Sequence, residues 1–208
     1  FMGIGLVDPI LPAISRELDA SPTQTMLLFT SYLLITALAM FFSAFISSRI
    51  GVKTTLLIGL ALIVAFSALS GAAGSVDAII GFRAGWGLGN ALFISTALAA
   101  IVGAAAGHAG QAVILYEAAI GVGMAIGPLV GGVLGEISWR APFYGTAVLM
   151  AAGFIAIATL LAKAERKPEP VALTAGLAAA KDPALLTLGF VAFFYNFGFF
   201  TLLAYSPY

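Results

Sequence analysis

Long apolar stretches separated by short polar turns constrain this chain more than any other feature of its sequence. A helix needs roughly 20 apolar residues to cross a lipid bilayer. Charged residues make up 9% of the chain, whereas an ordinary soluble domain has about 25%. The pattern predicts an all-α integral membrane protein, with helices near residues 1–14, 23–47, 54–70, 78–102, 112–134 and 141–162 and a seventh that begins near Ala184.

The spacing of these stretches predicts three parts. Residues 1–162 form an N-terminal six-helix transmembrane bundle, residues 163–183 form a polar cytoplasmic linker, and residues 184–208 are the truncated first helix of a C-terminal bundle. Both ends fall inside apolar runs. We therefore expect the chain to be the amino-terminal half of a longer protein, with the start of its seventh helix.

Basic residues indicate which turns face the cytoplasm. The turns after the first, third and fifth predicted helices hold Arg16 and Arg140. The turns after the second, fourth and sixth hold Arg49, Lys53, Lys163, Arg166, Lys167 and Lys181. This excess predicts that the loops after helices two, four and six are cytoplasmic, in a multi-pass protein of a plasma membrane or cell inner membrane.

Missing residue types exclude several kinds of site. The chain has no cysteine and one histidine, so neither a thiolate site nor an imidazole-rich metal site can form. No G-x-x-x-x-G-K-[ST] loop is present, which argues against ATP as the direct energy source. The net charge of zero gives no indication of nucleic acid. We expect no metal, no cofactor and no nucleic-acid partner.

Two classes of function besides transport are less favoured alternatives. An intramembrane enzyme needs a nucleophile with a base, or a metal constellation. Here His108 is predicted in a loop, and the buried acids lie on different helices. A non-transporting scaffold or sensor has little reason to hold Asp8 and Arg83 in membrane helices, where a charge costs at least ~2.5 kcal/mol near the centre.

The uncharged stretch GVGMAIGPLVGGVLG, residues 121–135, carries a glycine at every fourth position. These glycines are Gly123, Gly127, Gly131 and Gly135. At 3.6 residues per turn they form a stripe without side chains, along which a neighbouring helix can approach closely. Pro128 cannot donate to the carbonyl of Met124 and should bend the helix there.

The same stretch resembles a family motif. The antiporter motif g-x-x-x-G-P-x-x-G-G of the major facilitator superfamily, and more narrowly of its drug:proton antiporters, matches Gly123, Gly127, Pro128, Gly131 and Gly132. Further similarities are R-x-x-x-G-x-G at Arg83, Gly87 and Gly89, and the pair Trp139-Arg140 with Phe143 behind it. The segment Asp8-Pro9-Ile10-Leu11-Pro12 is similar to the acidic, proline-bearing first helix of the family.

One motif of the family is degraded in this chain. The turn between helices two and three usually reads G-x-x-x-D-R-x-G-R-K. Arg49, Gly51 and Lys53 match it, whereas Ala44, Ser48 and Val52 replace a glycine, an aspartate and an arginine.

The resemblance implies a six-helix bundle of two inverted three-helix repeats. It implies a secondary active transporter for small apolar or amphipathic compounds, exported in exchange for protons by alternating access. Such a protein would work in the lipid bilayer as a monomer, together with its C-terminal half. A metabolite importer or facilitator of the same fold remains the alternative within transport.

The resemblance also suggests roles for single residues. It assigns proton and substrate coupling to Asp8, Arg83 and Glu117. The polar residues expected to line the cavity are Asn90, Tyr195 and Asn196. The antiporter motif would seal one side of the protein, and Arg49, Gly51 and Lys53 would form a cytoplasmic gating turn. The alternatives are a permanent Asp8–Arg83 ion pair, Glu117 and Asn90 bonded to neighbouring helices, lipid-facing aromatic residues in the seventh helix, and plain packing by the glycines.

Overall fold

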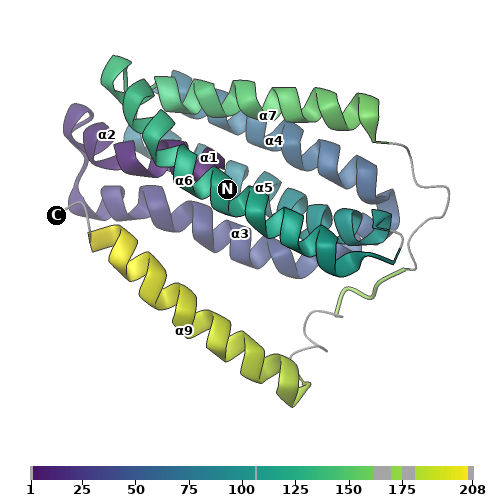
Figure 1. The fold of residues 1–208 in the computed structure, drawn as a ribbon. Helices are drawn as coiled ribbons and strands as arrows, with labels where there is room; N and C mark the ends of the chain where they lie inside the picture. The colour runs from purple at the N-terminus through teal and green to yellow at the C-terminus, as the bar shows by residue number, and fades with distance from the viewer. Residues whose placement is uncertain (1, 106, 162–169, 175–180, 206–208) are drawn as a thin grey trace. The chain divides into compact units, whose positions relative to one another are not determined.

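The computed structural model describes residues 2–105, 107–161, 170–174 and 181–205, and in these ranges it contains helices and turns but no strand (Figure 1). The predicted all-α fold is confirmed. Among the described residues, five helices are long and apolar enough to cross a membrane. In chain order the elements are α1 (Met2–Val7), the 3₁₀ turn η1 (Asp8–Ile10), α2 (Leu11–Glu17), α3 (Pro22–Ile50), α4 (Val52–Ala72), α5 (Val76–Ala104), α6 (Ala109–Ile137), α7 (Ala141–Leu160) and α9 (Pro183–Tyr205).

The chain divides into two compact units, Phe1–Pro170 and Val171–Tyr208. Helices α1 to α7 belong to the first unit, and α9 belongs to the second. Residues 162–169, which include the predicted linker residues Lys163, Arg166 and Lys167, lie outside the described part of the chain.

The first helix is broken, whereas the sequence predicts one helix over residues 1–14. It consists of α1, the turn η1 and α2. Pro9 lies within η1 and Pro12 in the first turn of α2. A proline lacks the N–H that an α-helix needs and clashes with the preceding turn, so two prolines three residues apart account for the interruption. Asp8 is the first residue of the break.

A single residue, Gly51, connects α3 to α4. Its φ angle is +90°, a conformation that residues with a side chain rarely adopt. The opposite end of α3 has a side-chain cap. Ser21 and Gln24 form a capping box at the start of α3. The turn is therefore fixed by its glycine and holds the end of α3 close to the start of α4.

Helix α5 lies between α3 and α4 and contacts both through glycines. A Cβ atom on Gly87 would lie 2.9 Å from Oγ1 of Thr36 in α3. On the other side, a Cβ on Gly89 would lie 2.7 Å from the carbonyl oxygen of Gly59 in α4. Backbones that meet this closely gain van der Waals contact. Such contact drives helices to associate in a membrane, where burying apolar side chains gives no hydrophobic gain.

Polar contacts align α3 with α5. Nε2 of Gln24 donates to Oδ1 of Asp77 at 2.9 Å, and Oγ of Ser31 donates to the carbonyl of Ile80 at 3.2 Å. Thr36 reaches the carbonyl of Gly87 further along both helices. The residue numbers rise together, so α3 and α5 run parallel.

We predict that Gly89→Ala lowers the free energy of unfolding by about 1–3 kcal/mol, because the added methyl group overlaps the backbone of α4. The matched control is Gly81→Ala in the same helix, where a Cβ meets nothing within 4 Å and helix propensity should be neutral or favourable. Thermal unfolding of the purified full-length protein measures both. Equal melting temperatures for the two variants would contradict the assigned α4–α5 contact.

Candidate functional site

A buried arginine marks the centre of the candidate site. Arg83 in α5 is 2% exposed, although it lies in a helix that can span a membrane. Its guanidinium carbon lies 5.4 Å from the ring centroid of Tyr32 in α3 and 5.6 Å from that of Trp86 in α5. Both distances fit cation–π interaction, which gains strength where water is excluded. The two aromatic faces thus stabilise a charge that is costly inside a membrane.

The break in the first helix lies in the same core. Val7 and Ile10, which flank the break, are 0% and 5% exposed, and both belong to one buried cluster with Tyr32 and Trp86. A Cβ on Gly3 would lie 3.5 Å from Cζ2 of Trp86. The backbone of Asp8 therefore runs through the apolar region that holds Arg83. The side chain of Asp8 lies outside the described part of the structure, so its pairing with Arg83 stays a prediction.

Aromatic rings continue from the buried arginine to the start of α7. Ring centroids are 5.8 Å apart for Tyr32–Trp86, 6.4 Å for Trp86–Phe143 and 6.3 Å for Phe143–Trp139, and all three pairs are edge-to-face. Such edge-to-face pairs are favourable contacts for aromatic rings. They link α3 and α5 to the start of α7, and the first two rings, Tyr32 and Trp86, also contact Arg83.

Sequence reasoning missed Tyr32 as part of this site. Trp86 had a local signal, because it lies three residues after Arg83 and so on the same side of the helix. Tyr32 is 51 residues from Arg83 in the chain, and no pattern of spacing could connect them. Their contact depends on the parallel packing of α3 and α5.

The side of α5 that carries Arg83, Gly87 and Asn90 also contacts α3. Asn90 is buried, with 7% of its surface exposed. Gly87 lies between Arg83 and Asn90 along α5. The hydroxyl of Thr36 in α3 donates to the carbonyl of Gly87 at 3.1 Å and to that of Tyr32, in its own helix, at 2.7 Å. At Gly87 this side of α5 is a helix–helix interface and does not line an open cavity. A cavity role for Asn90 stays a prediction.

The glycine stripe of α6 faces the first helix. Gly127 and Gly131 are buried. A Cβ on Gly5 would lie 3.0 Å from Cα of Gly127, and one on Gly131 would lie 2.8 Å from Cα of Leu6. A Cβ on Gly135 would meet the side chain of Ile10 at 2.7 Å. The close packing predicted from the stripe is present, and its partner is the broken helix that carries Asp8.

The other residues of the antiporter motif lie differently. Gly132 is exposed, and a Cβ there would meet nothing within 4 Å. Pro128 is exposed and lies inside α6, where its Cδ would be 3.1 Å from a Cβ on Gly5. The motif therefore has one side against α1 and one side turned outward.

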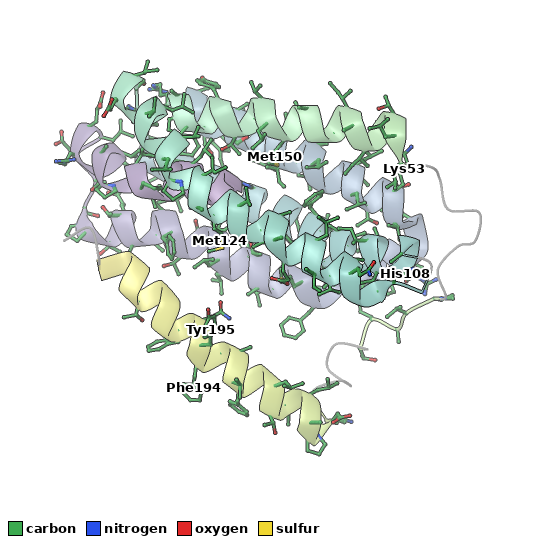
Figure 2. The ribbon with its side chains drawn as sticks, in the orientation of Figure 1. Lys53, His108, Met124, Met150, Phe194 and Tyr195 are labelled. Atoms are coloured by element: carbon green, nitrogen blue, oxygen red, sulfur yellow. The ribbon has the colours of Figure 1, made fainter. Side chains whose placement is uncertain are left out.

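The remaining predicted polar residues are exposed. Glu117 lies on the surface of α6, and its side chain makes no hydrogen bond to another described residue. On α9, Tyr195 is 73% exposed, and Nδ2 of Asn196 donates to the carbonyl of Ala192 in its own helix at 2.8 Å. Tyr195 and Phe194 extend in different directions from α9 (Figure 2). Not all of these side chains can face one cavity.

The residues of the predicted gating turn have separate contacts. The guanidinium of Arg49 lies 5.2 Å from the ring centroid of Phe45 in its own helix. The side chain of Lys53, a residue of α4, lies beside the end of α7 (Figure 2). Its Nζ donates there to the carbonyls of Ala158 and Leu161 at 2.8 and 2.6 Å. Ser48, which replaces the family's aspartate, donates to the carbonyl of Phe45 at 2.8 Å. A serine hydroxyl carries no charge, unlike the aspartate that it replaces.

No group of three or more histidine, cysteine, aspartate or glutamate residues that could hold a metal occurs in the part of the chain that the structure describes.

Comparison with known proteins decides the family. A model of the Major Facilitator Superfamily matches residues 1–208. The chain belongs to this superfamily. Membership in the Major Facilitator Superfamily, together with the apolar helices, makes it part of an integral, multi-pass membrane protein. It also agrees with the interpretation as part of a transporter rather than an enzyme.

Relatives within the superfamily carry names that concern export and resistance. The chain is 58% identical over 208 residues to multidrug efflux protein YfmO of Bacillus subtilis, which covers 100% of this chain and 52% of the relative. It is 33% identical over 162 residues to the tetracenomycin C resistance and export protein of Streptomyces glaucescens, covering 76% of this chain and 30% of the relative. It is 30% identical over 189 residues to the class C tetracycline resistance protein of Escherichia coli, covering 82% of this chain and 44% of the relative.

The chain thus spans about half the length, or less, of the curated relatives that it matches.

We predict that Thr36→Val destabilises the full-length protein by about 0.6 kcal/mol, and by no more than about 1.7 kcal/mol, because it removes an interhelical hydrogen bond. Thr159→Val is the matched control, since that exposed hydroxyl bonds only within α7. The measurement is chemical unfolding of both variants in the same detergent. A control as destabilised as Thr36→Val would show that the α3–α5 bond contributes nothing.

Proposed function

We propose that this chain is the amino-terminal half of a secondary transporter that exports small apolar or amphipathic compounds in exchange for protons. The observation that carries the proposal is the buried Arg83, a fixed charge in a spanning helix beside the break in the first helix. Charges inside a membrane protein bundle mark transport pathways and proton relays. The names of the relatives support drugs as the exported compounds.

The proposed coupling uses Asp8 and Arg83. The backbone of Asp8 lies in the core that contains the aromatic partners of Arg83. A carboxylate in such surroundings is stabilised by a nearby cation when it is ionised, and by the apolar surroundings when it is protonated. A bound substrate that alters the position of Asp8 or Arg83 would then change how tightly Asp8 holds its proton. Substrate binding and proton binding would exchange in this way. Glu117, exposed on α6, is the proposed second proton site.

Alternating access would consist of rocking two six-helix halves about a midplane site. The proposed polar lining consists of Asn90, Tyr195 and Asn196. The transporter would act as a monomer, with the loops after α3, α5 and α7 in the cytoplasm. The excess of basic residues in those loops supports this orientation.

The glycine seam between α1 and α6 would keep the outer side closed to leakage during this movement. Gly127 and Gly131 bring the backbone of α6 against Gly5 and Leu6, two to three residues before Asp8. Any side chain at these positions would force the broken helix away from α6. The seam therefore supports both a tight seal and a fixed position for the backbone of Asp8.

We predict that Asp8→Asn in the full-length protein abolishes proton-coupled export while the protein stays folded, because the amide cannot bind and release a proton. The measurement is the pH change inside vesicles when a candidate drug is added to a preformed gradient. Size-exclusion chromatography of the same sample checks folding. Unchanged coupling in this variant would refute the assignment of Asp8.

We predict that Gly131→Ala lowers export in the same vesicles by tenfold or more, because the new methyl group would lie against the backbone of Leu6. Gly132→Ala is the matched control from the adjacent position of the motif, where a Cβ meets nothing within 4 Å. Its export should be close to that of the original protein. Equal activity in the two variants would remove the basis for the seal.

A further inference from the structure

Two basic residues bind the ends of helices other than their own. Lys53 is the second residue of α4, and its Nζ donates to the carbonyls of Ala158 at 2.8 Å and Leu161 at 2.6 Å, where α7 ends. Arg140 directly precedes α7, and its guanidinium donates to the carbonyls of Gly71 at 2.6 Å and Ala73 at 2.8 Å, where α4 ends. Each helix thus supplies the cation that caps the other.

The physical chemistry of helix ends explains why these contacts stabilise the pair. The last carbonyls of a helix have no partner within it, and they form the negative end of its dipole. Neither α4 nor α7 has a basic residue in its own last turn. The charge-assisted hydrogen bonds to these carbonyls therefore come from the start of the neighbouring helix, and bonds of this kind are shorter and stronger than neutral ones.

The helices between the two caps are in contact along their length. A Cβ on Gly71 would lie 3.2 Å from Cβ of Phe143, near one end, and a Cβ on Gly153 would lie 4.0 Å from Cδ1 of Leu60, further along. The start of α4 meets the end of α7, and the start of α7 meets the end of α4, so the two helices run antiparallel. Ring stacking holds Arg140 in place, because its guanidinium carbon is 4.2 Å from the ring centroid of Trp139.

The two caps occupy corresponding positions in the chain. Counting the broken helix as the first, α4 is the third spanning segment and α7 is the sixth. In a bundle of two inverted three-helix repeats these are equivalent helices. Lys53 and Arg140 stand at the start of each, so the two caps occupy equivalent positions in such a pair of repeats.

We propose that Lys53 and Arg140 form a reciprocal clasp that makes α4 and α7 one rigid pair. Lys53 then acts within this half and is not a free gating charge for the opposite half. Its role differs from that of Arg49 in the same turn, whose guanidinium lies over its own helix. That the pair stays rigid throughout a transport cycle rests on the proposed function, whereas the clasp itself does not.

Hydrogen exchange tests the caps in the full-length protein without any substrate. Lys53→Met should speed exchange about tenfold in residues 157–160, equivalent to about 1.4 kcal/mol, because the last turn of α7 loses its partner and opens locally. Arg140→Met should do the same in residues 69–72. The matched controls are Arg49→Met and Arg16→Met, which remove the same charge from exposed positions. Exchange in these two segments that is no faster in the clasp variants than in the controls would overturn the proposal.

Conservative variants keep the test decisive if a methionine variant does not fold. Lys53→Arg and Arg140→Lys each retain a cation that can reach the same carbonyls. Exchange within a factor of about two of the original protein supports capping by charge and hydrogen bonds. A tenfold increase in both folded conservative variants would show that side-chain shape, not the clasp, protects these ends.

Distances between spin labels test the rigid pair. The 208 residues contain no cysteine, so labels can be placed on exposed cysteines at Thr54 and Leu160, near one cap, or at Leu69 and Val148, near the other. A third label pair, with one label in each half of the full-length protein, reports whether the halves move when pH and drug are changed. The proposal requires constant distances within α4–α7 while the third distance changes.

Two outcomes of the labelling experiment are informative in different ways. An α4–α7 distance that changes together with the third distance overturns the rigid pair. If adding drug moves none of the labels but Lys53→Met and Arg140→Met broaden the α4–α7 distances, the clasp stands and the proposed export of drugs fails. The two proposals are thus tested separately.

Discussion

Close contact between helix backbones is the constraint on which the bundle depends. Lipid chains are as apolar as leucine, so burying apolar side chains between helices gives no net hydrophobic gain in a membrane. Contact has to come from surfaces that approach closely, as at Gly59 with Gly89 and at Gly131 with Leu6. Helix α5 has a glycine toward α3 and another toward α4, and this fixes the order of the three helices.

Close contact also determines where polar groups can lie. A membrane interior offers no water, so each polar group needs a partner within the protein. Thr36 finds the carbonyl of Gly87 because no side chain separates the two helices there. Arg83 is held between the rings of Tyr32 and Trp86. The charge proposed for transport thus depends on the same packing that holds α3, α5 and α7 together.

Much of the fold could be predicted from the sequence, because a spanning helix needs a long apolar run that is visible without tertiary information. The structure extends most of the predicted helices by a few residues, as where α3 ends at Ile50 and 47 was expected, whereas α7 ends at Leu160 and 162 was expected. The break at Asp8 was not predicted, although Pro9 and Pro12 were visible. Within the candidate site, Arg83 and the glycines had local signals. Tyr32 had none, because its partner is distant in the chain.

Apolar runs and glycine spacing were enough to predict an all-α membrane protein in which Gly127, Gly131 and Gly135 lie on one side of a helix. Helical periodicity is a property of a single segment, so it shows which side of its own helix a residue occupies. Which helix lies opposite depends on contacts among all of them. The contacts of this stripe with α1, and the capping of each other's helices by Lys53 and Arg140, could therefore be seen only in the folded bundle.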